Sequence, residues 1–324
     1  MPETAISTRE LTKVFGHFTA VDNLNLQVRT GELFGLLGPN GAGKTTTVRM
    51  LCTLIEPTRG TATVAGYDIT RDPARVRREI GVVSDGVMLY KDLTVEENLK
   101  FLSTIYKIPS KMAEDRVREL LEMFGFKEKA KRLVSALSSG WAKKAMICAA
   151  LLHSPSVLFL DEVTSGLDPQ SAIALRDFTK DLCRQGVTVI WTTHYMEEPQ
   201  RICDRVGVVF AGKLVQVGTP NELKRNVTDV TALEVESPGL SAAQVARIRN
   251  LRDVVKVTYE DPMLRITAGR KDGFIESVTD TLRAINARIS AINTKEPTLE
   301  EAFISLTGGE EEIDRFLEIT SRRK

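Results

Sequence analysis

The segment LLGPNGAGKTTTVRML, residues 36–51, decides the fold, because three glycines and a proline separate an apolar run from a helical pattern. The preceding GELFGLLG has the length of a buried strand, and the apolar residues that follow the glycines recur at helical spacing. Gly38, Gly43, Lys44 and Thr45 satisfy G-x-x-x-x-G-K-[ST] at this strand-to-helix turn. The pattern predicts a loop that cradles phosphates.

The chemistry of such a loop explains its composition. Successive backbone N–H groups must point at phosphate oxygens, which requires conformations that side chains forbid. The helix that begins near Lys44 adds its unpaired N–H groups, Lys44 reaches the β and γ phosphates, and the Thr45 hydroxyl can ligate Mg²⁺. The alternative is a glycine-rich turn without a ligand. The residues that we expect around the nucleotide are Gly38, Pro39, Asn40, Gly41, Ala42, Gly43, Lys44, Thr45 and Thr46.

A second apolar run ends in two adjacent carboxylates. In SVLFLDEVTSGLD, residues 156–168, four apolar residues precede Asp161 and Glu162. We predict that Asp161 binds the metal and that Glu162 acts as the general base or polarises the attacking water. Taken by itself, such a pair after a strand is usually solvated loop charge, and the phosphate loop is what favours the functional interpretation.

A third apolar run, VTVIWTTH at residues 187–194, ends at His194, one of three histidines. In open α/β sheets, ligands gather at the carboxyl ends of the strands. We therefore expect His194 to contact the γ phosphate or the attacking water. The alternative is a partly buried histidine whose ring is satisfied by the protein.

Composition narrows the function classes. The chain has 324 residues, of which 42% are hydrophobic and 27% charged, and its net charge is +1. The mixed charges disfavour nucleic-acid binding. The four dispersed cysteines indicate buried thiols in a reducing compartment. With no apolar leader and no 18-residue apolar run, we expect neither export nor a membrane span.

The stretch LSSGWAKKAMICAALLHSP, residues 137–155, begins like an anion site, although Ser138 or Ser139 as a helix N-cap would explain the serines without any ligand. LSSG followed by LLHSPSVLFLDEVTSGLD resembles the signature, Walker B and D-loop series of the ATP-binding cassette (ABC) ATPases. The resemblance covers residues 5 to about 225, with every landmark in order. It implies an α/β fold, a P-loop NTPase cassette with a helical subdomain, which binds and hydrolyses ATP with Mg²⁺.

The resemblance also assigns roles to single positions. Two cassettes of this family close head to tail, so that each ATP lies between one phosphate loop and the signature of the other cassette. Phe15 resembles the aromatic that stacks on adenine, although a core aromatic is an equally good interpretation of that residue. The other assignments are Ser138, Ser139 and Gly140 to the signature acting in trans, Ser165 to Asp168 to the D-loop at the dimer seam, with Asp168 counted among the ATP-binding residues, and His194 to the switch histidine.

Three departures from the family pattern stand out. Asp85 replaces the usual glutamine near Mg²⁺, and we count it as an additional candidate metal ligand. The signature has Ser139 and Trp141 where glycine and glutamine are usual, which predicts weaker signature binding. Val163 replaces a proline, a smaller change. Because Glu162 and His194 remain, we expect an active ATPase with altered coupling.

The sequence predicts that the chain has three parts. Residues 1–226 form the cassette, with a helical subdomain at about 88–155. Residues 227–308 read as strand, helix, strand, strand, helix, strand and a further helix, which predicts a small ferredoxin-like α+β domain. Residues 309–324 form a charged helical tail. This ending resembles the C-terminal extension of single-cassette exporters in the sodium-efflux and drug-efflux branch.

The resemblance implies an ATP-hydrolysing subunit of an ABC exporter, peripheral on the cytoplasmic face of the cell membrane. Its expected partners are a separate ABC-2-type permease, which moves ions, drugs or lipids, and a second cassette, with no nucleic acid. Two alternatives stay open. One is a soluble ABC ATPase that acts on ribosomes or DNA, and the other is a nucleotide-dependent regulator that does not hydrolyse ATP.

Overall fold

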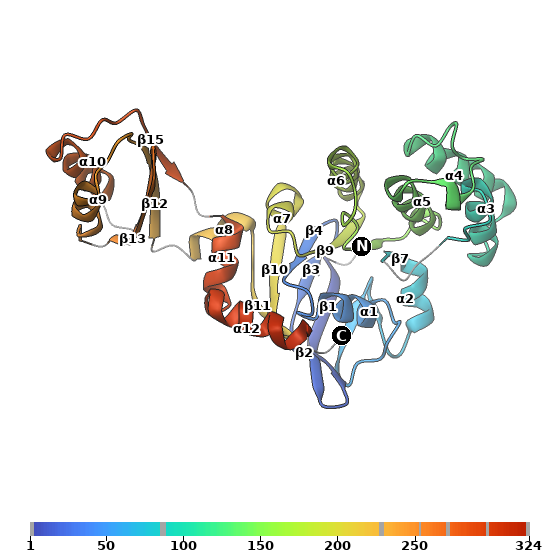
Figure 1. Cartoon of the computed structure of the whole chain (residues 1–324). Coiled ribbons are helices and arrows are strands. Elements are labelled where there is room, and N and C mark those ends of the chain that lie inside the picture. The colour runs from blue at the N-terminus through green and yellow to red at the C-terminus, as the bar shows by residue number, and fades with distance from the viewer. Residues whose placement is uncertain are drawn as a thin grey trace. The chain divides into compact units, whose positions relative to one another are not determined.

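The computed structural model describes residues 3–84, 89–226, 230–252, 254–269, 273–295 and 298–321 (Figure 1). The chain divides into two compact units. The first is Met1–Thr219 together with Asp314–Lys324, and the second is Pro220–Ile313. The predicted boundary after residue 226 falls at the end of α8 (Pro220–Asn226), which belongs to the second unit. The predicted tail begins at residue 309, whereas the first unit takes up the chain again at Asp314.

The first unit is organised around a six-stranded sheet in the order β11-β10-β4-β9-β8-β7, in which five strands are parallel and β11 is an antiparallel edge. Strands β4, β8 and β9 are buried along their whole length, since parallel sheets are covered on both faces. This burial explains their uninterrupted apolar runs. The strands are β4 (Leu33–Leu37), β7 (Ile80–Val83), β8 (Val157–Asp161), β9 (Thr188–Thr193), β10 (Arg205–Phe210) and β11 (Lys213–Gly218).

A second, antiparallel sheet has the order β2-β1-β5-β6, with β3 paired to β1. A core of buried side chains joins the two sheets and includes Ile6 of β1, Phe34 of β4 and Met50 of α1. Helix α1 is thereby fixed between the sheets. The elements are β1 (Thr4–Phe15), β2 (Phe18–Leu24), β3 (Gln27–Arg29), β5 (Arg59–Val64), β6 (Tyr67–Asp68), α1 (Lys44–Leu51), α2 (Pro73–Glu79), α6 (Pro169–Arg184) and α7 (Glu197–Ile202).

The predicted helical subdomain consists of α3 (Val95–Ile105), α4 (Ser110–Met123), the short 3-10 helix η1 (Val134–Ala136) and α5 (Ser139–Leu151). These helices gather beside one another in Figure 1. Leu99 of α3 and Val117 and Leu120 of α4 are buried, in agreement with the helical spacing of apolar residues in the sequence. Tyr106 lies just past the end of α3 and stacks on His153.

The second unit contains the four-stranded antiparallel sheet β13-β14-β12-β15. Helices α9 and α10 cover one face, and Val245 and Val278 pack there against Leu233 and Val235 (Figure 1). This is the predicted ferredoxin-like order, and α11 packs against α8 in the same unit. The elements are β12 (Val230–Glu236), α9 (Ala242–Arg249), β13 (Val254–Glu260), β14 (Met263–Gly269), α10 (Phe274–Ala284), β15 (Ala291–Lys295) and α11 (Leu299–Leu306), followed by α12 (Glu310–Ser321).

In the described ranges, no helix combines the length and the apolarity that crossing a bilayer requires.

The start of α3 offers a test of the fold. Thr94 caps this helix by accepting a hydrogen bond from Glu97 N at 3.1 Å, while the Glu97 carboxylate accepts one from Thr94 N at 2.8 Å. This is a complete capping box. Thr94→Ala removes the cap, and we expect it to lower the free energy of unfolding by about 1 kcal/mol in denaturant titrations followed by circular dichroism.

The matched control is Thr104→Ala in the same helix. Thr104 is exposed, and its hydroxyl bonds only to Lys100 O, one turn earlier. We expect this change to alter the free energy of unfolding by less than about 0.5 kcal/mol. Equal losses in the two variants would contradict the role given to the cap.

Candidate active site

The carboxyl ends of three neighbouring strands bring the predicted residues together. Strand β9 lies between β4 and β8, with Leu37 beside Thr193 and Asp161 beside Thr192. The phosphate loop follows β4, His194 follows β9, and Glu162 follows β8. Chain segments more than one hundred residues apart therefore meet at one edge of the sheet.

The phosphate loop packs against backbone that leaves no room for side chains. A Cβ on Gly38 would lie 2.1 Å from Val209 O, and a Cβ on Gly43 would lie 2.5 Å from Ala20 O. Gly43 also adopts φ 108° as the N-cap residue of α1. The first turn of α1 directs its N–H groups into this loop, as an anion site requires. Close contacts thus require glycine at Gly38 and Gly43, and at Gly43 the backbone conformation requires it as well.

Lys44 is the most constrained charged residue of the site. Its side chain is buried, and Nζ donates hydrogen bonds to Gly38 O at 2.8 Å and Pro39 O at 3.1 Å. Nζ also forms an ion pair with Glu162 Oε1 at 3.3 Å. Burial lowers the pKa of Lys44, and the Glu162 and Asp161 carboxylates oppose that shift. Lys44 is therefore folded back onto its own loop and held there by carbonyls and a carboxylate.

Asp161 and Thr45 place two oxygen ligands next to each other. Asp161 Oδ1 accepts hydrogen bonds from Thr192 Oγ1 at 2.5 Å and Thr45 Oγ1 at 3.3 Å. Burial raises the pKa of Asp161, although these two hydroxyls favour its charged form. Carboxylate and hydroxyl oxygens are hard ligands that suit Mg²⁺. In the described part of the chain, no cluster of three or more histidine, cysteine or acidic side chains is arranged for a metal.

Glu162 lies between Lys44 and His194. Its second carboxylate oxygen is 3.4 Å from His194 Nδ1, an ion-pair distance without hydrogen-bond geometry. Within the described ranges, the buried Nδ1 atom has no hydrogen-bond partner. The backbone of Glu162 is left-handed, with φ 50°. This is uncommon for a residue other than glycine and is typical of functional sites. Glu162 can orient a water molecule while Lys44 and His194 contact phosphate oxygens.

The predicted signature residues lie elsewhere in this chain. Ser138 is the N-cap residue of α5, as the simpler interpretation of the serines had it, but its side chain makes no capping hydrogen bond. Ser139 Oγ donates to Gly166 O at 3.2 Å. Among the described residues, no hydrogen bond or ion pair joins residues 138–140 to the phosphate loop. Their predicted action on a second cassette stays a prediction.

Trp141, which departs from the family pattern, is held by its neighbours. Its ring packs edge-on against Phe126, with centroids 5.0 Å apart. The ammonium groups of Lys129 and Lys144 lie 3.9 and 4.7 Å from the ring centroid. The tryptophan therefore fixes two cations next to the start of α5.

The remaining predicted residues have simple surroundings. Phe15 ends β1 and is 48% exposed, with Lys13 Nζ 5.0 Å from its ring centroid, so its interpretation as a core aromatic is wrong. Its predicted contact with adenine stays a prediction. Asp168 caps α6 by accepting a hydrogen bond from Ser171 N at 2.9 Å, and its hydrogen bonds with Ser171 lower its pKa. Asp85 lies outside the described residues.

Sequence reasoning missed two buried threonines. Thr192 bonds to Asp161, and Thr193 Oγ1 donates to Glu198 Oε2 at 2.7 Å. Both lie in the segment VTVIWTTH, residues 187–194. The two hydroxyl side chains at the end of this apolar strand were the sequence feature that could have identified them. Lys143 was missed as well, and its Nζ donates to Ser165 O at 2.9 Å.

Comparisons with known proteins agree with this geometry. Residues 21–165 match the ABC transporter family. The linearmycin resistance ATP-binding protein LnrL of Bacillus subtilis is 35% identical over 94% of this chain and 98% of its own length. The doxorubicin resistance ATP-binding protein DrrA of Mycobacterium tuberculosis is 36% identical over 90% of this chain and 89% of its own.

A solved structure supports the same family. The ATP-binding subunit of an ABC transporter superposes with a TM-score of 0.63 at 28% identity, over 69% of this chain and 93% of that one. The family that the sequence motifs resembled is thus confirmed. The chain belongs to the ABC transporter family and is one of its ATP-binding ATPases.

Proposed function

We propose that this chain is the ATP-hydrolysing subunit of an exporter and that it binds Mg²⁺-ATP at the phosphate loop. The observation that carries the proposal is the meeting of Lys44, Asp161, Glu162 and His194 at the ends of three adjacent strands. Together they offer a cation, a candidate metal ligand, a base and an imidazole, which are the groups that an in-line attack on a γ phosphate uses.

Each residue then has one task. The loop N–H groups and Lys44 hold the β and γ phosphates, once Lys44 has exchanged its carbonyl partners for phosphate oxygens. Glu162 orients the attacking water and accepts its proton, and His194 contacts the γ phosphate. Water adds to the γ phosphorus as the bond to the ADP oxygen breaks. Thr45 and Asp161 would hold Mg²⁺, which neutralises phosphate charge when bound.

A second cassette completes the proposed site. Ser138, Ser139 and Gly140 make no hydrogen bond or ion pair with the phosphate loop among the described residues of this chain. The Ser138 side chain nevertheless leaves the start of α5 uncapped, and the N–H groups of a helix start have no partner within the helix, which favours an anion. We assign these residues to the nucleotide of a second copy. The resulting homodimer sits on the cytoplasmic face of the membrane.

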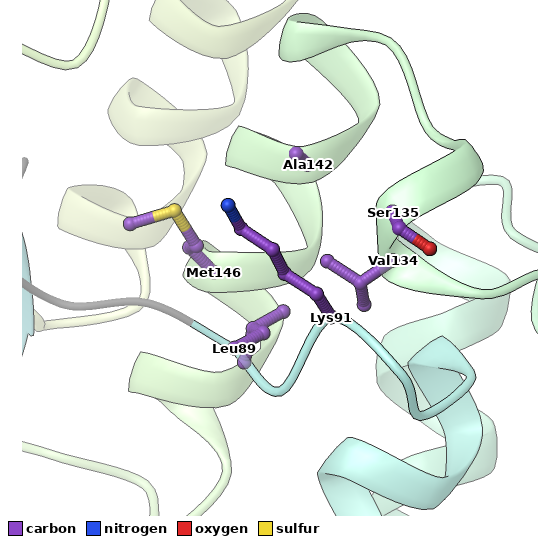
Figure 2. A pocket seen from close by; sticks show the side chains of 6 residues that line it. All are labelled: Leu89, Lys91, Val134, Ser135, Ala142 and Met146. Carbon is purple, nitrogen blue, oxygen red and sulfur yellow. The ribbon is translucent and has the colours of Figure 1, made fainter.

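A surface of the helical subdomain suits the permease. A cavity of about 330 Å³ is lined by Leu89, Lys91, Val134, Ser135, Ala142 and Met146 (Figure 2). Tyr90 and Leu133 are sequence neighbours of residues that line the cavity, and they are 56% and 44% exposed. Exposed apolar side chains around a cavity mark an interaction surface. Because α5 lines the cavity and begins at Ser139, a partner seated there is well placed to move the signature residues.

The relatives' names suggest the cargo. They are described as linearmycin and doxorubicin resistance proteins, which favours export of an antibiotic by a separate ABC-2-type permease over export of ions or lipids. A ribosome- or DNA-acting ATPase is disfavoured by the net charge of +1. A regulator without turnover is disfavoured by the presence of Glu162 beside His194.

Glu162→Gln tests hydrolysis. The change keeps the size of the side chain and removes the base, so we expect phosphate release to fall by about 100-fold or more while ATP binding persists. The measurement is phosphate release by purified protein with its permease and Mg²⁺-ATP.

The matched control is Glu197→Gln. Glu197 is 85% exposed, on the helix that follows His194, and pairs only with Arg201 on the surface. Its rate should equal that of the wild type. A wild type that releases no more phosphate than Glu162→Gln would favour the non-hydrolysing regulator.

Val134→Glu tests the permease surface. The new carboxylate adds a charge to the cavity, so we expect the tagged chain to co-purify at least five-fold less of a co-expressed ABC-2-type permease. Met112→Glu is the control, since Met112 is 63% exposed on α4 and does not line the cavity. Undiminished recovery with a folded Val134→Glu protein would remove this surface from the proposal.

A further inference from the structure

One buried hydroxyl connects the Asp161 carboxylate with the backbone of Glu162. Thr192 Oγ1 donates to Asp161 Oδ1 at 2.5 Å and accepts a hydrogen bond from Glu162 N at 3.1 Å. Thr192 is fully buried near the end of β9. The hydroxyl therefore uses its donor on one carboxylate and an acceptor on the backbone of the next residue.

Glu162 depends on that support. Its left-handed backbone is unfavourable for a residue with a side chain, and such conformations persist only where surrounding contacts impose them. Its N–H group is held by Thr192 Oγ1 and also lies 3.2 Å from Thr192 O. A single residue of the neighbouring strand thus fixes the backbone from which the proposed base projects.

We propose that Thr192 is a positioning residue for hydrolysis, which sets the orientation of Glu162 and Asp161 without contacting the nucleotide. This inference rests on the proposed function. It separates ATP binding from hydrolysis, because among the described residues no hydrogen bond joins the Thr192 side chain to the phosphate loop directly. The two are linked only through the Asp161 oxygen that Thr192 shares with Thr45.

Three variants test the proposal. Thr192→Val keeps the shape and removes the hydroxyl, and we expect kcat to fall at least ten-fold while the KM for ATP and the Kd of a fluorescent ATP analogue change less than three-fold. Thr192→Ser restores the hydroxyl and should recover most of kcat. Thr188→Val is the matched control, because Thr188 is equally buried on the same strand and accepts a backbone hydrogen bond from Gly31 N at 3.0 Å.

A merely structural role predicts that Thr192→Val and Thr188→Val lose stability and kcat together. Either that result or a Thr192→Ser variant as slow as Thr192→Val would overturn the inference. A wild type without hydrolysis refutes the proposed function instead, so the two failures are distinguishable.

A second, independent observation concerns the last helix. Within the first unit, the Thr320 side chain of α12 lies against Gly41 at the apex of the phosphate loop, where a Cβ on Gly41 would be 3.0 Å from Thr320 Cγ2. One turn earlier, the Phe316 ring packs on Phe210 with centroids 4.9 Å apart. Phe210 ends β10, and the turn that follows holds the loop through a hydrogen bond from Gly212 N to Ala42 O at 3.0 Å.

The loop conformation on which α12 rests is the one in which Lys44 is folded back onto Gly38 O and Pro39 O. Contacts that fit one of two arrangements stabilise that arrangement and oppose a ligand that needs the other. Lys44 Nζ already directs its three donors at these two carbonyls and the Glu162 carboxylate, so a contact with a phosphate oxygen has to replace at least one of them. We infer that docking of α12 and binding of ATP oppose each other, which makes α12 an autoinhibitory element of the proposed ATPase.

Phe316→Ala in the full chain weakens the docking without altering the phosphate loop. We expect this variant to bind a fluorescent ATP analogue with Mg²⁺ at least three-fold more tightly than the wild type. Leu317→Ala is the control, since the adjacent Leu317 is 39% exposed. Amide hydrogen exchange of residues 310–321 should also become faster when ATP is added.

Equal or weaker binding by Phe316→Ala, or exchange that ATP leaves unchanged or slows, would overturn the inference about α12. Absence of ATP binding by the wild type would instead refute the proposed function, on which the inference rests.

Discussion

The structure depends on the close contact between the phosphate loop and the backbone around it. Gly38 lies against Val209 O and Gly43 against Ala20 O, at distances that exclude a Cβ. The loop is therefore tied to both sheets of the first unit, through β10 on one side and β2 on the other. This contact fixes where α1 begins, and hence where its N–H groups and Lys44 point. Any side chain at these two positions would displace the loop from the strands that supply the other site residues.

The sheet order places the other candidate site residues next to this anchored loop. Because β9 separates β4 from β8 by a single strand, Glu162 is within reach of both Lys44 and His194. The two most buried charged groups each have polar partners there. Lys44 has a carboxylate at 3.3 Å, while the Asp161 carboxylate receives two hydroxyl hydrogen bonds. Burial without such partners would be costly for each of these groups.

The sequence allowed the phosphate loop, the two carboxylates and His194 to be predicted, because each follows an apolar run that only a buried strand explains. It also predicted the ferredoxin-like order of the second unit. Thr192 was not recognised, since a threonine in an apolar strand is ordinary and its importance comes from the register that pairs it with Asp161. The contact between Thr320 and Gly41 joins residues 279 positions apart, and no local pattern encodes it. The two interpretations of Phe15 could not be separated from the sequence, because a single aromatic residue does not reveal whether its side chain is exposed.

Three features of the site share one property, which is that their present partners are replaceable. Lys44 bonds to two carbonyls of its own loop, His194 Nδ1 lies near Glu162 without a hydrogen bond, and Gly41 has a threonine methyl resting on it. A triphosphate offers oxygens that suit Lys44 and the imidazole better than these partners do. Thr192, by contrast, has its donor and an acceptor engaged in hydrogen bonds that hydrolysis does not need to break. The site thus combines a fixed frame on β8 and β9 with contacts around the loop that the proposed nucleotide would replace. This combination agrees with the proposed function, in which a change at the phosphate loop is passed to a partner.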